Sequence, residues 1–113
     1  MATFTNGSVV LVSFPFSDLS HAKLRPAVVL AKVSHGDLIL CQITSNPYSD
    51  STAIKLTAAQ FLNGFLERES FVRPGKLFTA NEKIIVREIG ILLEECRQTI
   101  VKHIIELLTS STE

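Results

Sequence analysis

Residues 25–44 read Arg-Pro-Ala-Val-Val-Leu-Ala-Lys-Val-Ser-His-Gly-Asp-Leu-Ile-Leu-Cys-Gln-Ile-Thr, two apolar runs joined by a short polar segment. The β-branched residues in the runs at 26–33 and 37–44 are typical of strands. Between these runs, Ser34-His35-Gly36 supplies a glycine that can adopt positive φ, as hairpin turns require. The sequence therefore predicts an antiparallel hairpin at the centre of the fold.

The geometry of this hairpin relates its two ends. If the turn is centred between Ser34 and His35, Arg25 stands directly opposite Thr44, and if it is centred one residue further on, the two become diagonal neighbours. Both cases place the two side chains on one face of the sheet, whereas a three-residue turn would place them on opposite faces. We therefore expect a guanidinium beside a hydroxyl at the rim of the sheet.

Shorter apolar runs extend the sheet on both sides of the hairpin. Strands are predicted at 8–14, 53–56, 70–73, 76–79 and 82–89, with Pro74-Gly75 dividing two of them. Residues 16–24 and 45–52 lack an alternating pattern and are expected to be loops. A brief helical piece is predicted to open at Thr57 and to end at Asn63-Gly64.

The C-terminal segment from Leu92 to Leu108 has helical periodicity. Apolar residues recur at spacings of three and four, which predicts one buried stripe formed by Leu93, Cys96, Ile100, Val101, Ile104, Leu107 and Leu108. Ile105 lies outside this stripe, where it either widens the buried face or contacts another subunit. Many short strands, tight turns and a closing helix predict a mostly β, small antiparallel barrel with the helix packed against it, as a single domain over residues 1–113.

Composition narrows the function classes. The 113 residues carry 11 Lys and Arg against 11 Asp and Glu, and this neutral balance argues against a broadly basic nucleic-acid binder, so only a localised basic site is compatible with it. No apolar run approaches a membrane span and no secretory signal is visible, so we expect a cytoplasmic protein. Cys41 and Cys96 lie far apart without metal-ligand spacing, so neither a disulfide framework nor a zinc site is indicated. No cofactor is expected.

A set of short motifs in order along nearly the whole chain resembles one family. The motifs are Gly7-Ser-Val-Val-Leu-Val, Pro15-Phe-Ser-Asp18, Lys23-Leu-Arg-Pro-Ala-Val-Val29, Gln42-Ile-Thr-Ser45, Ser70-Phe-Val-Arg-Pro74, Lys76-Leu-Phe-Thr79 and Ile89-Gly-Ile-Leu92. Together they resemble the MazF/PemK family of toxin–antitoxin ribonucleases. The resemblance implies an SH3-like barrel, a homodimer, metal-independent cleavage of single-stranded RNA, and neutralisation by a small antitoxin that lays an acidic, apolar segment over the RNA groove.

The resemblance also implies the catalytic residues, Arg25 and Thr44. In metal-free RNA cleavage a ribose 2′-hydroxyl attacks the adjacent phosphorus and leaves a cyclic phosphate, while negative charge accumulates on the phosphoryl oxygens. A guanidinium fork and a hydroxyl are suitable donors to those oxygens. Two positions depart from the family pattern: Ser8 replaces a common acidic residue, and Lys76 replaces a glutamine often found in the RNA-contacting strand.

Further residues are predicted to bind substrate. They are Phe16, Lys23, Ser45, Arg73 and Lys76. The cations Lys23, Arg25, Arg73 and Lys76 are expected at one rim, with carboxylates such as Glu88 elsewhere. His21 has the pKa range for proton transfer, although a loop histidine without a catalytic role is the simpler interpretation.

Two alternatives remain at this stage. The chain could be a non-catalytic binding module of the same barrel type, like the gyrase-poisoning toxins, in which case the C-terminal helix would carry the function. It could also be a degenerate family member that only binds antitoxin. Cleavage of RNA in EDTA would distinguish the ribonuclease from both.

Overall fold

The computed structural model describes residues 4–15, 22–47 and 50–110, with 14, 15, 22 and 23 described by their backbone alone. Its strands are β1 (Ser8–Pro15), β2 (Ala22–Lys32), β3 (Asp37–Thr44), β4 (Ile54–Leu56), β5 (Phe61–Gly64), β6 (Ser70–Asn81) and β7 (Ile85–Leu92). Short 3₁₀ turns lie at Ser34–Gly36, Ala58–Gln60 and Glu82–Ile84. The helix α1 spans Glu94–Thr109 and follows β7 directly.

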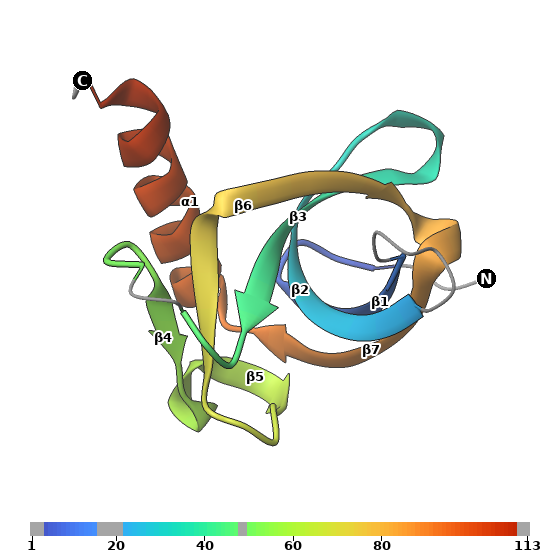
Figure 1. The fold of residues 1–113 in the computed structure, drawn as a ribbon, viewed down its shortest axis with the longest axis horizontal. Coiled ribbons are helices and arrows are strands. Elements are labelled where there is room, and N and C mark those ends of the chain that lie inside the picture. The colour runs from blue at the N-terminus through green and yellow to red at the C-terminus, as the bar shows by residue number, and fades with distance from the viewer. Residues whose placement is uncertain (1–3, 16–21, 48–49, 111–113) are drawn as a thin grey trace.

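The strands form one antiparallel sheet in the order β4-β6-β3-β2-β1-β7-β5. Figure 1 shows this sheet curling on itself into a half-barrel, with α1 lying against the outside of β6. The central hairpin of β2 and β3 occupies the middle of the order, as its apolar content predicted. The predicted fold class, a small antiparallel barrel with a C-terminal helix, is confirmed.

Both faces of the central strands are buried, in two apolar clusters. Val9, Val28 and Cys41 pack with the helix residues Cys96 and Ile100 on the outer face. Their neighbours in the chain, Val10, Ala27 and Leu40, belong to a second cluster inside the curl. Successive strand residues point to opposite faces. This explains why β1, β2 and β3 read as continuous apolar runs rather than as alternating ones.

The turn of the central hairpin differs from both predicted centrings. Next to the turn, Lys32 pairs with Leu38, a register that would put the side chains of Arg25 and Thr44 on opposite faces. A β-bulge between Val29 and Ala31 then shifts the pairing, so that Ala27 pairs with Gln42. Extended by two residues beyond the last pair, this register would set Arg25 opposite Thr44. The bulge, which was not foreseen, thus restores the parity on which the prediction rests.

Other segments also differ from the sequence prediction, and one of them is residues 22–24, which were expected to be loop but begin β2. The strand β6 is continuous rather than divided at Pro74-Gly75, but its pairing with β3 shifts between Cys41 and Ile43, so the proline lies where no regular ladder needs its missing N–H. The helical piece at Thr57 shortens to Ala58–Gln60, because the following residues pair with β7 as β5. Residues 82–84 form a 3₁₀ turn, capped by the Asn81 side chain, which accepts from the Lys83 N–H.

The helix was predicted correctly in place but not in the extent of its buried stripe. Cys96, Ile100 and Ile104 are buried against the sheet. Leu107 is 42% exposed and Leu108 is 70% exposed, so the prediction that both are buried is wrong. Figure 1 shows the reason, since the C-terminal end of α1 extends away from the sheet. Ile105 is also exposed, which leaves an apolar end on the helix.

Candidate functional site

An open pocket of about 730 Å³ lies at the end of the sheet where β2 begins and β3 ends. Its lining residues come from β1, β2, β3, β7, the loop between β5 and β6, and the start of β6. They include Arg25 and Thr44 together with Ser45, the residue after β3. Because the loop runs directly into β6, these are five separate stretches of the chain, and they meet at the rim that the hairpin geometry indicated.

Arg25 and Thr44 are held differently. Arg25 is half-buried in β2, where its backbone pairs with Val12 of β1. Thr44 is buried, and its hydroxyl is 3.1 Å from both the N–H and the carbonyl oxygen of Asn46. The hydroxyl accepts from the N–H and donates to the carbonyl, which fixes its position at the turn after β3. The rim thus presents a guanidinium and an oriented hydroxyl to one pocket.

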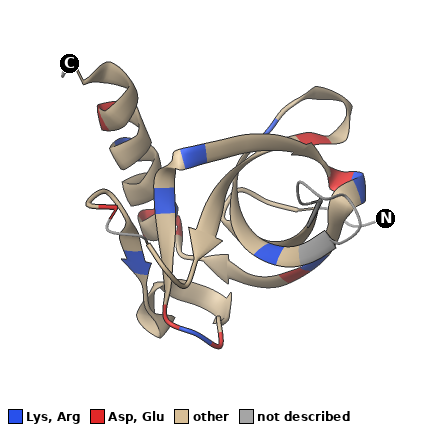
Figure 2. Ribbon diagram, viewed as in Figure 1, with Lys and Arg blue, Asp and Glu red and all other residues tan. Residues whose placement is uncertain are grey.

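The charges that line the pocket are mixed. Three arginines, Arg25, Arg68 and Arg87, share it with two carboxylates, Glu67 and Glu88. Glu88 accepts a 2.6 Å hydrogen bond from the hydroxyl of Ser8, a buried residue. The expectation that Glu88 lies away from the cationic rim is therefore wrong. Its cause is the bulged pairing of β7 with β1, which brings Glu88 beside Val10. Figure 2 shows charges of both signs around this end of the sheet.

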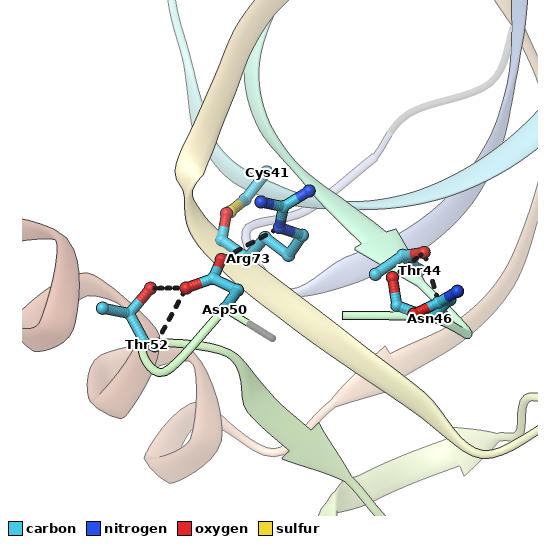
Figure 3. Close-up of polar contacts among 6 residues, drawn as sticks. All are labelled: Cys41, Thr44, Asn46, Asp50, Thr52 and Arg73. Atoms are coloured by element: carbon cyan, nitrogen blue, oxygen red, sulfur yellow. Dashed lines mark hydrogen bonds and ion pairs between the residues drawn. The ribbon is translucent and has the colours of Figure 1, made fainter. Parts of the chain in front are cut away.

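Arg73 belongs to a separate cluster on β6. Its Nε is 2.9 Å from Oδ2 of Asp50, and both side chains are largely buried. The other oxygen of Asp50 accepts from the hydroxyl and the N–H of Thr52, at 2.6 and 2.9 Å. These hydrogen bonds, chiefly from Thr52 and then from Arg73, lower the pKa of Asp50 to about 2. Figure 3 shows Arg73 turned toward Asp50, apart from Thr44 and Asn46. The ion pair joins the segment before β4 to β6.

Residues 5–108 match the family model described as the PemK-like, MazF-like toxin of type II toxin–antitoxin systems. The chain belongs to this family. No curated protein sequence matches the toxin.

Solved structures share the fold of the toxin. A MazE–MazF crystal structure from Deinococcus radiodurans matches with a TM-score of 0.77 at 16% identity, over 98% of this chain and 100% of that chain. The Mycobacterium tuberculosis toxin MazF-mt6 matches with a TM-score of 0.64 at 19% identity, over 88% and 93%. An endoribonuclease in complex with its cognate antitoxin from a mycobacterial species matches with a TM-score of 0.65 at 12% identity, over 95% of this chain and 93% of that chain. At these identities the likeness shows the fold.

The other predicted site residues of the toxin are spread out. Ser45 is exposed and lines the pocket. Lys76 is exposed on β6 and, like Arg73, is not among the residues that line the pocket. Phe16 and His21 lie outside the described residues, and Lys23 is placed by its backbone in β2. The structure therefore brings Ser45 to Arg25 and Thr44, and sets Arg73 and Lys76 away from the pocket.

Three residues that line the pocket were not predicted from the sequence. Phe65 and Arg68 lie on the loop between β5 and β6, and Arg87 lies on β7. In the sequence, residues 65–69 read Phe-Leu-Glu-Arg-Glu, a mixed-charge stretch that is typical of a solvated loop. No local signal marks them, because pairing between remote strands brings them to the pocket. The strand β5 pairs with β7 just before the loop, and Arg87 pairs with Leu11 of β1.

Both cysteines of the toxin, Cys41 and Cys96, are buried and free of disulfide bonds. Cys41 is fully buried, and burial raises its pKa to about 12, so it is a thiol that donates to the Arg73 carbonyl at 2.9 Å. Within residues 4–15, 22–47 and 50–110, no group of three or more His, Cys, Asp or Glu is arranged to hold a metal ion. The same residues contain no helix long and apolar enough to cross a membrane.

Proposed function

We propose that the toxin is an endoribonuclease that cleaves single-stranded RNA by attack of a 2′-hydroxyl on the adjacent phosphorus, without a metal ion. One observation carries this proposal: in a member of the PemK-like, MazF-like family, Arg25 and Thr44 line the same pocket from neighbouring strands. Their donors suit the negative charge that accumulates on two phosphoryl oxygens during the attack.

The two donors differ in what they contribute. A guanidinium keeps its proton at neutral pH, so Arg25 acts as a planar, bidentate donor and not as a base. The Thr44 hydroxyl has one proton, which points at the Asn46 carbonyl in the free protein. Rotation about the C–O bond turns this O–H toward a bound phosphate oxygen, to which it donates a hydrogen bond. The Asn46 N–H continues to donate to the hydroxyl oxygen. Ser45 supplies a second hydroxyl at the same rim.

Membership of this toxin family also suggests the partners of the toxin. We propose that a small antitoxin neutralises the toxin in the cytoplasm by covering the RNA site with an acidic, apolar segment. A homodimer is part of this proposal, and the exposed apolar end of α1 around Ile105, Leu107 and Leu108 supports a protein contact there. The same surface favours the second candidate, a non-catalytic toxin that acts by binding another protein through α1.

Cleavage of a mixed-sequence RNA in EDTA tests the proposal. We expect products that carry a 2′,3′-cyclic phosphate from the wild-type toxin, and at least a hundredfold slower cleavage by Arg25→Ala, because one preorganised donor contributes a rate factor of about 10² to 10³. Lys102→Ala, on α1 outside the pocket, is the matched cation control and should cut at the wild-type rate. Wild-type cleavage by Arg25→Ala would refute the site. An absence of products from the wild type would favour the binding module.

A further inference from the structure

The loop between β5 and β6 is anchored at both ends. Gly64 has φ of +78°, and a Cβ there would overlap the carbonyl oxygen of Ile89, so the chain passes directly against β7 at this point. Leu66 packs on the apolar cluster beneath α1. The hydroxyl of Ser70 donates to the Arg68 carbonyl at 2.8 Å and closes the far end of the loop. A loop held in this way presents its remaining side chains in defined positions.

Phe65 lies between two of these anchors and is nevertheless turned outward. The backbone of Gly64 pairs with β7 and Leu66 is half-buried, but the Phe65 side chain is 63% exposed and lines the pocket together with Arg25. Exposure of a large aromatic ring to water is unfavourable, and most of this ring is left uncovered by the rest of the chain. An exposed ring on an anchored loop is suited to stack against a flat, aromatic ligand.

The charge of the pocket favours a ligand with phosphates. Arg68 and Arg87 are exposed and line the same pocket as Phe65. With Arg25 they make three cations against the carboxylates Glu67 and Glu88, so the lining has an excess of one positive charge. So small an excess holds a phosphate chain weakly, and useful affinity requires a second contribution. Stacking of a base on Phe65 supplies it without demanding a particular sequence.

We propose that Phe65, flanked by Arg68 and Arg87, forms a base-stacking subsite for single-stranded RNA. The subsite extends the RNA path from Arg25 and Thr44 across the pocket to the loop between β5 and β6. The ring carries an unpaired base, and the two guanidinium groups take the phosphates on either side of it. This inference rests on the proposed RNA cleavage and assigns where a nucleotide next to the reacting phosphate is held.

The absence of tryptophan from the chain provides a direct test. Phe65→Trp places a single indole in the proposed subsite, and Leu62→Trp places one on β5 at a position with 66% exposure that does not line the pocket. The probe is a short, mixed-sequence, single-stranded RNA with 2′-fluoro groups, which cannot be cleaved. We expect the probe to quench the emission of Phe65→Trp saturably and to leave that of Leu62→Trp unchanged, because a stacked base quenches indole.

Binding affinities give a second readout with the same control pair. Fluorescence anisotropy of the labelled probe should show binding weakened about tenfold to a hundredfold by Phe65→Ala, and unchanged by Leu62→Ala. Arg68→Gln and Arg87→Gln should each reduce the dependence of the affinity on salt. All four substituted residues are exposed, so we expect every variant to fold, and thermal melting should confirm this.

Each outcome separates the subsite from the proposed function. If the wild type binds and cleaves RNA while Phe65→Trp is not quenched and Phe65→Ala binds normally, the subsite is wrong and the ribonuclease assignment stands. If the wild type neither binds the probe nor cleaves RNA, both fail. If an acidic, apolar peptide quenches Phe65→Trp and RNA does not, the loop is a protein-docking surface, which also overturns the proposal.

Discussion

The pocket and the Asp50–Arg73 cluster lie near the same end of β3, but their charged side chains differ in pairing and in exposure to water. In the cluster one guanidinium meets one carboxylate at 2.9 Å, and both side chains are largely buried. In the pocket three arginines and two carboxylates line an open hollow. The sequence around an arginine therefore does not reveal whether the arginine binds substrate. The nearest carboxylate in the fold decides whether its charge serves stability or binding.

The largest effect that separates the two regions is expected at Thr44. Thr44→Val preserves shape but removes the hydroxyl, so we expect RNA cleavage to slow by about 10²-fold to 10³-fold. The free energy of unfolding should change by less than about 1 kcal/mol, because the Asn46 groups left behind are exposed to water. Thr79→Val, an exposed position on β6 outside the pocket, is the control. Cleavage within threefold of wild type would remove Thr44 from the site.

In the cluster, the expected loss is one of stability. Arg73→Met keeps the length of the side chain and leaves the Asp50 carboxylate without its cation, which should lower the free energy of unfolding by roughly 1–3 kcal/mol. Lys55→Met is the matched control, because Lys55 and Glu69 also form an ion pair, at 2.7 Å, but both side chains are more than half exposed. That pair should contribute less than about 1 kcal/mol. Equal losses in urea titrations would show that burial does not distinguish the two pairs.

A smaller effect is expected from acid. The pKa of Asp50 is lowered from 3.8 to about 2 in the folded toxin, so its contribution to stability is present above about pH 4 and is lost as the pH falls toward 2. The difference in unfolding free energy between wild type and Asp50→Asn should therefore shrink from pH 5 to pH 2. Thr52→Val removes the largest cause of the shift and should move this loss to higher pH. A difference that is constant across this range would contradict the lowered pKa.

The smallest effect is expected at Cys41 of β3, whose thiol donates to the Arg73 carbonyl. Its side chain is fully buried and its pKa is raised to about 12, so iodoacetamide at pH 8 should not modify it in the native toxin. Modification should appear in urea, at the concentration where the chain unfolds, as measured by mass spectrometry. Rapid alkylation of Cys41 in native buffer would show that the end of β3 opens easily.

Local pattern predicted the elements whose partners lie close in sequence or whose faces are entirely apolar. The bounds of β3 and the start of β1 were predicted correctly, and the buried residues Cys96, Ile100 and Ile104 of α1 follow from helical spacing. Segments that depend on remote pairing were less predictable. The segment Phe61–Gly64 is a strand because it pairs with β7, and nothing in the four residues themselves predicts this pairing.

The site shows the same division. The prediction that Arg25 and Thr44 share a rim came from hairpin arithmetic and from the family resemblance, and both residues line one pocket. The hairpin arithmetic assumed a regular ladder, whereas a bulge between Val29 and Ala31 restores the parity that the turn alone would have lost. Arg73 was grouped with Arg25 as a cation, but Asp50, separated from it by 23 positions, binds it.

By itself, the sequence determined the antiparallel hairpin, the C-terminal helix and membership of the toxin family, because strand and helix periodicities and ordered motifs reside in contiguous residues. Only the tertiary structure decided which charges meet. It brought Glu88 to the pocket, tied Arg73 to Asp50 and set Phe65 outward on an anchored loop. The physical reason is that electrostatic and stacking interactions depend on distances between side chains, and those distances are set by pairing between strands far apart in the chain.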